Sequence, residues 1–168
     1  RTLGDLKGRT LSYTSETSSS VYLYQRAVYS EQNLDPDDHL KSRFTRDHME
    51  SLRVLETGVC DGAAVYDKIW IEAADHGLEA SSFSVLAPTE RVAWDAYCVT
   101  DILDAETTEA LRKALIDLKL GSPLGQSILT DNDLPFAGFL PGDDSLYDPT
   151  RRIEKFLNLE IEQGEAPQ

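Results

Sequence analysis

Short apolar segments alternate with amphipathic ones along the amino-terminal part of the chain. The segments 10–13 and 42–45 have the length and composition of strands, and the small apolar run 62–65 suits a strand buried on both faces. An apolar stripe at helical spacing predicts a helix over 20–31. By the same criteria, further helices are predicted over 47–56, 67–76, 105–120, 123–130 and 149–159, and further strands over 83–87 and 93–99.

This order of elements indicates the fold class. Strands and helices alternate at intervals of 10 to 20 residues up to position 99, after which only helices are predicted. Such alternation is typical of an α/β fold with a mostly parallel sheet flanked by helices. We therefore expect an α/β lobe followed by a helical carboxyl-terminal segment.

A hydroxyl-rich run from Tyr13 to Ser20 joins the first predicted strand to the first predicted helix. A helix that starts there directs free backbone N–H groups and the positive end of its dipole toward one spot, and the hydroxyls add uncharged donors. An anion can be held in this way without Lys or Arg. The alternative is that one serine is a helix N-cap and the others belong to a solvated loop. The run alone leaves both interpretations open.

Three candidate sites lie at or near the ends of predicted strands. The serine-rich run and His48 each follow a strand, and Asp95 lies near the last one. In open parallel sheets, ligands bind beyond the carboxyl ends of the strands, where these groups are expected to gather. Their convergence favours a binding site over a solvated loop.

Charge and composition exclude several classes of partner. The 168 residues carry a net charge of −14, which argues against nucleic acid or an anionic membrane surface as partner. No run of 18 apolar residues is present, so we expect no membrane insertion by this segment. The spacing of Cys60 and Cys98 fits no metal motif, and whether they pair stays open. We expect no metal and no cofactor.

Several segments, taken in order, resemble the phosphonate-binding proteins of ABC transporters. The resemblance covers nearly the whole chain. The matching residues are Leu6-Lys7-Gly8-Arg9-Thr10-Leu11, Ser18-Ser19-Ser20 with Tyr22, Phe44-Thr45 with His48, Val59, Asp61, Ala63-Ala64-Val65, the helices at 105–120 and 123–129, Gly138-Phe139-Leu140-Pro141 and Tyr147-Asp148-Pro149.

The resemblance implies a type II periplasmic solute-binding fold, whose two lobes close over a small oxyanion such as phosphonate, phosphite or phosphate. Residues 1–99 would be the ligand-binding second lobe, and 100–168 a return segment whose helices pack on the hinge or on the first lobe. The implied partners are the ligand and an ABC permease. The implied location is periplasmic or extracellular, with a membrane anchor as an option in the full-length protein.

The resemblance also implies ligand contacts from Ser18, Ser19, Ser20 and His48. Val21 stands where the family commonly has Gly, which bears on how closely the backbone can approach a ligand. Without the resemblance, His48 reads as an exposed histidine in the first turn of a helix.

Other contacts depend on the alignment. Asp95 matches a carboxylate that, in the family, helps to hold an amino group or a proton of the ligand. The alternative is a solvated loop residue. A second family carboxylate falls on Lys68, or on Asp67 after a slip of one residue; a Lys68 facing the cleft would favour a plain oxyanion. Tyr66 and Trp94 border these positions. Each either packs on the organic part of the ligand or is an aromatic residue of the core or the rim.

Two other functions are alternatives to uptake. The serines, His48 and Asp95 could form a nucleophile, base and orienting acid, but no Gly-x-Ser-x-Gly turn is present, so we expect no catalysis. The remaining alternative is a ligand-sensing or interaction module fused to a signalling protein.

Overall fold

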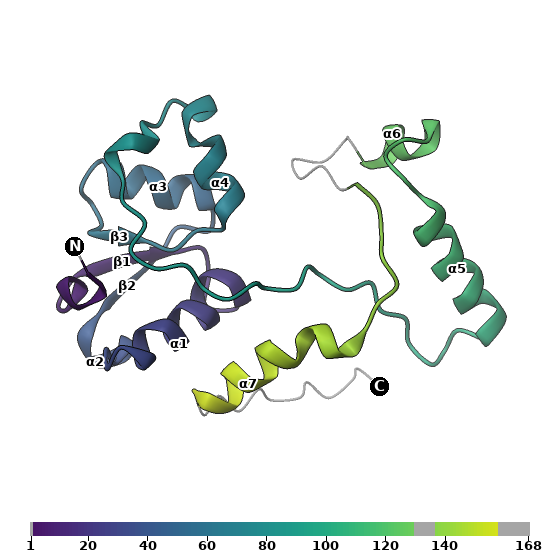
Figure 1. Ribbon diagram of the computed structural model, residues 1–168, viewed down its shortest axis with the longest axis horizontal. Coiled ribbons are helices and arrows are strands. Elements are labelled where there is room, and N and C mark those ends of the chain that lie inside the picture. Colours follow the sequence, from purple (N-terminus) through teal and green to yellow (C-terminus); the bar gives the residue numbers. More distant parts are fainter. Residues whose placement is uncertain (1, 130–136, 158–168) are drawn as a thin grey trace. The chain divides into compact units, whose positions relative to one another are not determined.

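Three parallel strands form the centre of the first half of the chain: β1 (Thr10–Tyr13), β2 (Lys41–Phe44) and β3 (Gly62–Ala63). Their order in the sheet is β2-β1-β3, so β1 lies in the middle (Figure 1). This computed structural model describes residues 2–129 and 137–157. It confirms the predicted α/β class with a parallel sheet.

Helices lie on both faces of this sheet, α1 and α2 on one and α3 and α4 on the other (Figure 1). A π-helix, Ser19–Leu23, runs directly into α1, and single 3-10 turns occur at Leu3–Leu6, Ala73–His76, Ala80–Ser82 and Asp144–Tyr147. The α-helices are α1 (Tyr24–Glu31), α2 (Pro36–His39), α3 (His48–Glu56), α4 (Asp67–Glu72), α5 (Ala105–Asp117), α6 (Pro123–Leu129) and α7 (Asp148–Phe156).

The side chains of β1 alternate between the two faces of the sheet, as the pleat of a strand requires. Leu11 and Tyr13 join a hydrophobic cluster on the α1 side. Ser12 lies between them and its hydroxyl bonds to the carbonyl oxygen of Ser51 in α3, 3.2 Å away. A second cluster on the α3 side contains Met49, Leu52, Ala73 and Leu78.

The chain divides into two units, residues 1–93 with 147–168, and residues 94–146. α7 belongs to the first unit because it packs on α1: Ile153 is buried beside Tyr24 and Ala27, and the Tyr24 hydroxyl lies 2.9 Å from that of Thr150. The second unit contains α5, α6 and an antiparallel bridge between Lys119 and Gly138.

The expected strands at 83–87 and 93–99 are wrong. Neither segment is paired with a strand, and Val85, Tyr97 and Val99 are at least half exposed. Their β-branched and aromatic residues give a strand-like pattern, but a strand also needs a neighbour to bond its backbone. The helix expected over 67–76 is α4 followed by a 3-10 turn. The ends of the helices expected at 130 and at 158–159 lie outside the described residues.

Close packing at Gly62 holds β3 against β1. A Cβ atom at this position would lie 2.5 Å from Cδ2 of Leu11, whose side chain is only 1% exposed and has little room to move. We expect Gly62→Ala to lower the free energy of unfolding by about 1–3 kcal/mol in urea denaturation. Gly121→Ala is the control, because nothing lies within 4 Å of a Cβ there. Equal effects of the two substitutions would contradict this packing.

Candidate functional site

The serine-rich run leads from β1 into the π-helix that precedes α1. Ser18 is the N-cap, with extended backbone angles (φ −76°, ψ 117°), and its side chain makes no capping hydrogen bond. Its carbonyl oxygen accepts from the N–H groups of both Tyr22 and Leu23, each 3.1 Å away. The first N–H groups of a helix, here from Ser19 onward, have no acceptor within the helix. The turn thus offers backbone donors beside hydroxyls that are not used as its cap.

His48 is the first residue of α3, directly after the turn that follows β2. The turn is fixed by Asp47, whose side chain accepts from the Glu50 N–H at 2.7 Å. Nδ1 of His48 is buried and has no hydrogen-bond partner among the described residues. Burial lowers the pKa of His48, and the Asp47 carboxylate opposes this effect only in part. The imidazole is therefore neutral near pH 7 and offers an uncharged donor.

Tyr66 packs against His48, with ring centroids 4.3 Å apart and ring planes at 83°. It is the N-cap residue of α4 and follows β3. Burial, with smaller contributions from the carboxylates of Glu72, Asp47 and Asp67, raises the pKa of its phenol, which keeps the hydroxyl protonated. The structure thus brings together two of the residues singled out in the sequence.

Asp67 and Lys68 open α4. Asp67 is exposed, whereas Lys68 is partly buried with its Nζ 3.3 Å from Oε1 of Glu72, one turn further along the helix. The Lys68 ammonium is thus compensated within its own helix. This contact does not decide which of the two residues corresponds to the family carboxylate.

Asp95 and Trp94 lie in the second unit, in a segment without helix or strand, and both are exposed. The expectation that Asp95 lies near the last strand is wrong, because the strand at 93–99 does not form. Its proposed ligand contact then depends on the resemblance alone.

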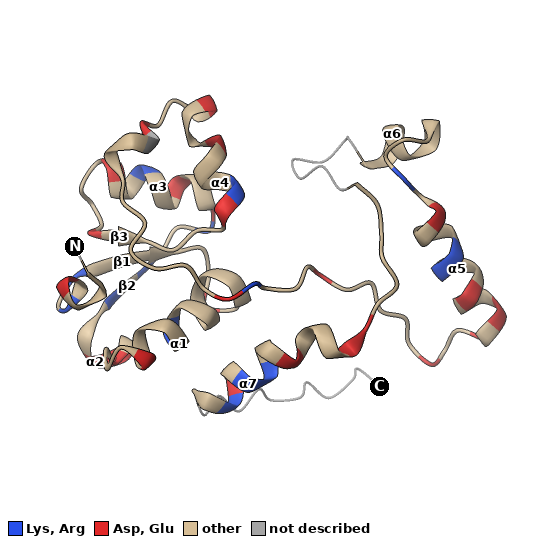
Figure 2. Ribbon diagram, in the orientation of Figure 1, with Lys and Arg blue, Asp and Glu red and all other residues tan. Residues whose placement is uncertain are grey.

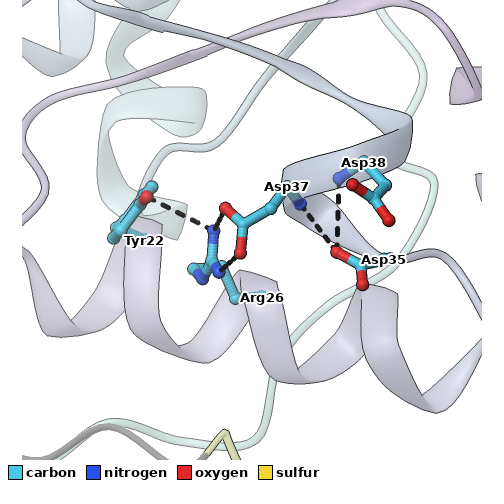
Figure 3. Close-up of polar contacts among 5 residues, drawn as sticks. All are labelled: Tyr22, Arg26, Asp35, Asp37 and Asp38. Atoms are coloured by element: carbon cyan, nitrogen blue, oxygen red, sulfur yellow. Dashed lines mark hydrogen bonds and ion pairs between the residues drawn. The ribbon is translucent and has the colours of Figure 1, made fainter.

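Arg26, the arginine of α1, forms an ion pair with Asp37. Arg26 donates to both carboxylate oxygens of Asp37, at 2.9 and 2.5 Å, and to the hydroxyl of Tyr22 at 3.3 Å (Figure 3). Asp35 holds the Asp37 backbone in place by accepting from its N–H. The ion pair lowers the pKa of Asp37. The guanidinium of Arg26 is therefore engaged by Asp37 and is not a free cation beside the serine turn.

The sequence did not indicate that a group of hydroxyls close to His48 in the chain is joined by hydrogen bonds. The Thr45 and Ser51 hydroxyl oxygens are 2.6 Å apart, and Ser12 and Ser51 are fully buried. Thr45 and Ser51 lie three residues before and three after His48, which is the signal that could have identified them.

Charge and composition add few other candidates. Acidic residues are spread over helices of both units (Figure 2). No group of three or more His, Cys, Asp or Glu residues suited to a metal occurs in the described part of the chain. Cys60 is buried, Cys98 is exposed, and both are free. Within the described ranges, no helix has the length and apolar character needed to cross a membrane.

Comparison with known proteins identifies the family and the fold of the chain. Residues 1–147 match the family model described as ABC transporter, phosphonate, periplasmic substrate-binding protein. Among solved structures, the chain is similar to PhnD1 from Prochlorococcus marinus (MIT 9301), determined in complex with methylphosphonate, with a TM-score of 0.72 and 18% sequence identity. The match covers 93% of this chain and 59% of that protein, so the chain spans less than two thirds of its structural relative. No curated protein matches the chain.

The structural likeness establishes the shared type II periplasmic-binding fold, and the family match covers most of the sequence. The chain belongs to the family of periplasmic substrate-binding proteins of phosphonate ABC transporters.

Proposed function

We propose that this chain binds a small tetrahedral phosphorus oxyanion at the carboxyl edge of its sheet. One observation carries the proposal: the serine turn, His48 and Tyr66 each follow one of three adjacent parallel strands. The segments that carry the serine turn and His48 are joined at the strand ends by a hydrogen bond, which the Thr45 N–H donates to the Tyr13 carbonyl at 2.9 Å. Donors from separate parts of the sequence are thereby directed to one edge.

Recognition would use uncharged donors. Backbone N–H groups and hydroxyls of Ser18, Ser19 and Ser20 would bind the anionic oxygens with support from the helix dipole. His48 would add a ring N–H, and Tyr66 would pack on the organic part of the ligand or donate its hydroxyl. Contacts from Asp67 and Asp95 are also proposed, for a ligand that carries an amino group. The methylphosphonate bound to the structural relative supports this class of ligand.

The proposed role is that of the solute-binding component of an uptake system. Lobes of this fold close over their ligand, and the closed form would deliver it to an ABC permease. The periplasmic description of the family supports a location outside the cytoplasmic membrane, with or without an anchor in the full-length protein. No step of this cycle changes the ligand covalently, so we propose no catalytic role.

A thermal-shift panel tests the proposal. Phosphite, phosphate, methylphosphonate, 2-aminoethylphosphonate, sulfate and thiosulfate are compared at fixed ionic strength. A ligand that binds only the folded state adds about 2.7 kcal/mol of stability at a concentration 100 times its Kd, so the midpoint should rise selectively with phosphorus oxyanions. Equal small shifts with every anion would indicate salt effects and reject the proposed function. A preference for 2-aminoethylphosphonate would favour Asp67 over Lys68 at the site.

A further inference from the structure

We propose that the hydroxyl pair of Thr45 and Ser51 positions the His48 ring relative to the serine turn. The inference rests on the proposed function, in which His48 contacts the anion. Neither hydroxyl is assigned to the ligand. Both act through His48, which lies between them in the first turn of α3.

The pair connects the start of α3 to the end of β1. The Thr45 Oγ1 lies 3.1 Å from the Tyr13 carbonyl oxygen, 3.0 Å from the Asp47 carbonyl oxygen and 2.6 Å from the Ser51 Oγ. The Ser51 hydroxyl also lies 3.1 Å from the Asp47 carbonyl. Each hydroxyl has one proton to donate and two lone pairs to accept with. Together the two hydroxyls therefore join the Tyr13 carbonyl of β1 to the Asp47 carbonyl, which precedes His48.

The backbone reinforces this connection. Besides the bond from Thr45 to Tyr13, the Arg46 N–H donates to the Thr14 carbonyl at 2.9 Å. Arg46 holds a left-handed conformation, φ 68°, which is costly for a residue with a side chain and is kept only where its surroundings demand it. Thr14 belongs to the run from Tyr13 to Ser20 that carries the serines. The turn before His48 is therefore fixed to the segment that carries the serines.

His48 has few other constraints on its ring. Its buried Nδ1 has no hydrogen-bond partner in the described part of the chain, and its ring packs edge-to-face on Tyr66. The direction of the ring is then set mainly by where the backbone places the first turn of α3. Binding groups need this kind of support, because a small displacement removes a hydrogen bond. Ser51 is fully buried, so water cannot replace the hydrogen bonds that its hydroxyl makes within the protein.

The test uses Thr45→Val, which keeps the branched shape and removes the hydroxyl, and Thr45→Ser, which restores it. Thr57→Val is the matched control, since the Thr57 hydroxyl bonds to the Arg53 carbonyl at the opposite end of α3, 2.9 Å away. The first readout is NMR of the His48 imidazole: its pH titration and its contact with the Tyr66 ring. The second is the affinity for methylphosphonate.

We expect Thr45→Val to weaken the His48–Tyr66 contact, to raise the pKa of His48 toward its ordinary value, and to reduce affinity about 10-fold. Thr45→Ser and Thr57→Val should behave like the unsubstituted chain. Unaltered His48 resonances in a folded Thr45→Val would overturn the proposal. If Thr45→Val does not fold, Ser51→Ala is tested in its place, with the same two readouts: the His48 resonances and the affinity for methylphosphonate. If the unsubstituted chain binds no anion, the proposed function fails, while the His48 resonances still decide whether the pair positions the ring.

Discussion

Replacing both Ser19 and His48 with Ala should abolish selective binding of phosphorus oxyanions and leave the fold intact. Each substitution removes a donor to a charged ligand, and such hydrogen bonds contribute about 1.5–3 kcal/mol. Because every 1.4 kcal/mol is tenfold in affinity, the joint loss is about two to four orders of magnitude if the two effects add. The measurement is the anion panel by thermal shift, with titration calorimetry for any anion that gives a selective shift.

Matched substitutions in the same unit separate this effect from a general change in charge or stability. Ser84 and His76 are both exposed and neither belongs to a segment that follows a strand directly, so Ser84→Ala with His76→Ala should leave the anion preference unchanged. Circular dichroism verifies that both double variants are folded. Retained selectivity in the Ser19 and His48 variant would reject the assignment of the site.

The sequence was informative about the site where local pattern and topology agree. Thr10–Tyr13 is short and apolar, hydroxyls follow it, and a helical stripe begins immediately afterwards. In a parallel sheet that order is sufficient to place the start of a helix at the carboxyl edge. His48 follows from the same reasoning, because it comes after the next strand of the sheet.

The sequence was misleading where a pattern needed a partner that it cannot specify. Residues 83–87 and 93–99 have strand composition, yet neither pairs with a strand. For that reason Asp95 was expected near a strand of the sheet, and it lies instead in an exposed segment of the second unit. Backbone pairing depends on contacts distant in sequence, whereas the apolar pattern is local.

Buried hydroxyls were the other feature that pattern reading missed. Ser12 occupies the polar position between Leu11 and Tyr13, which a simple alternation assigns to solvent. It is fully buried because both faces of the sheet are covered by helices, and its proton bonds to the Ser51 carbonyl. The periodicity of one strand does not show whether its second face is covered.

Truncation of Leu52 to Ala should be among the most destabilising single substitutions in the chain. Leu52 is 1% exposed and packs with Met49, Ala73 and Leu78 between α3 and the segment after α4. Removing a buried leucine side chain leaves a cavity and costs about 2–5 kcal/mol. Small domains are stable by only about 5–15 kcal/mol, so urea denaturation followed by circular dichroism should show a large fall in the midpoint.

Ile71→Ala is the control for this prediction, because Ile71 lies on α4 with 75% of its surface exposed. We expect it to change the free energy of unfolding by no more than about 0.5 kcal/mol. Similar small effects of both substitutions would mean that α3 does not pack as described. In that case the basis for placing His48 would also be lost, since Leu52 anchors the same helix one turn beyond it.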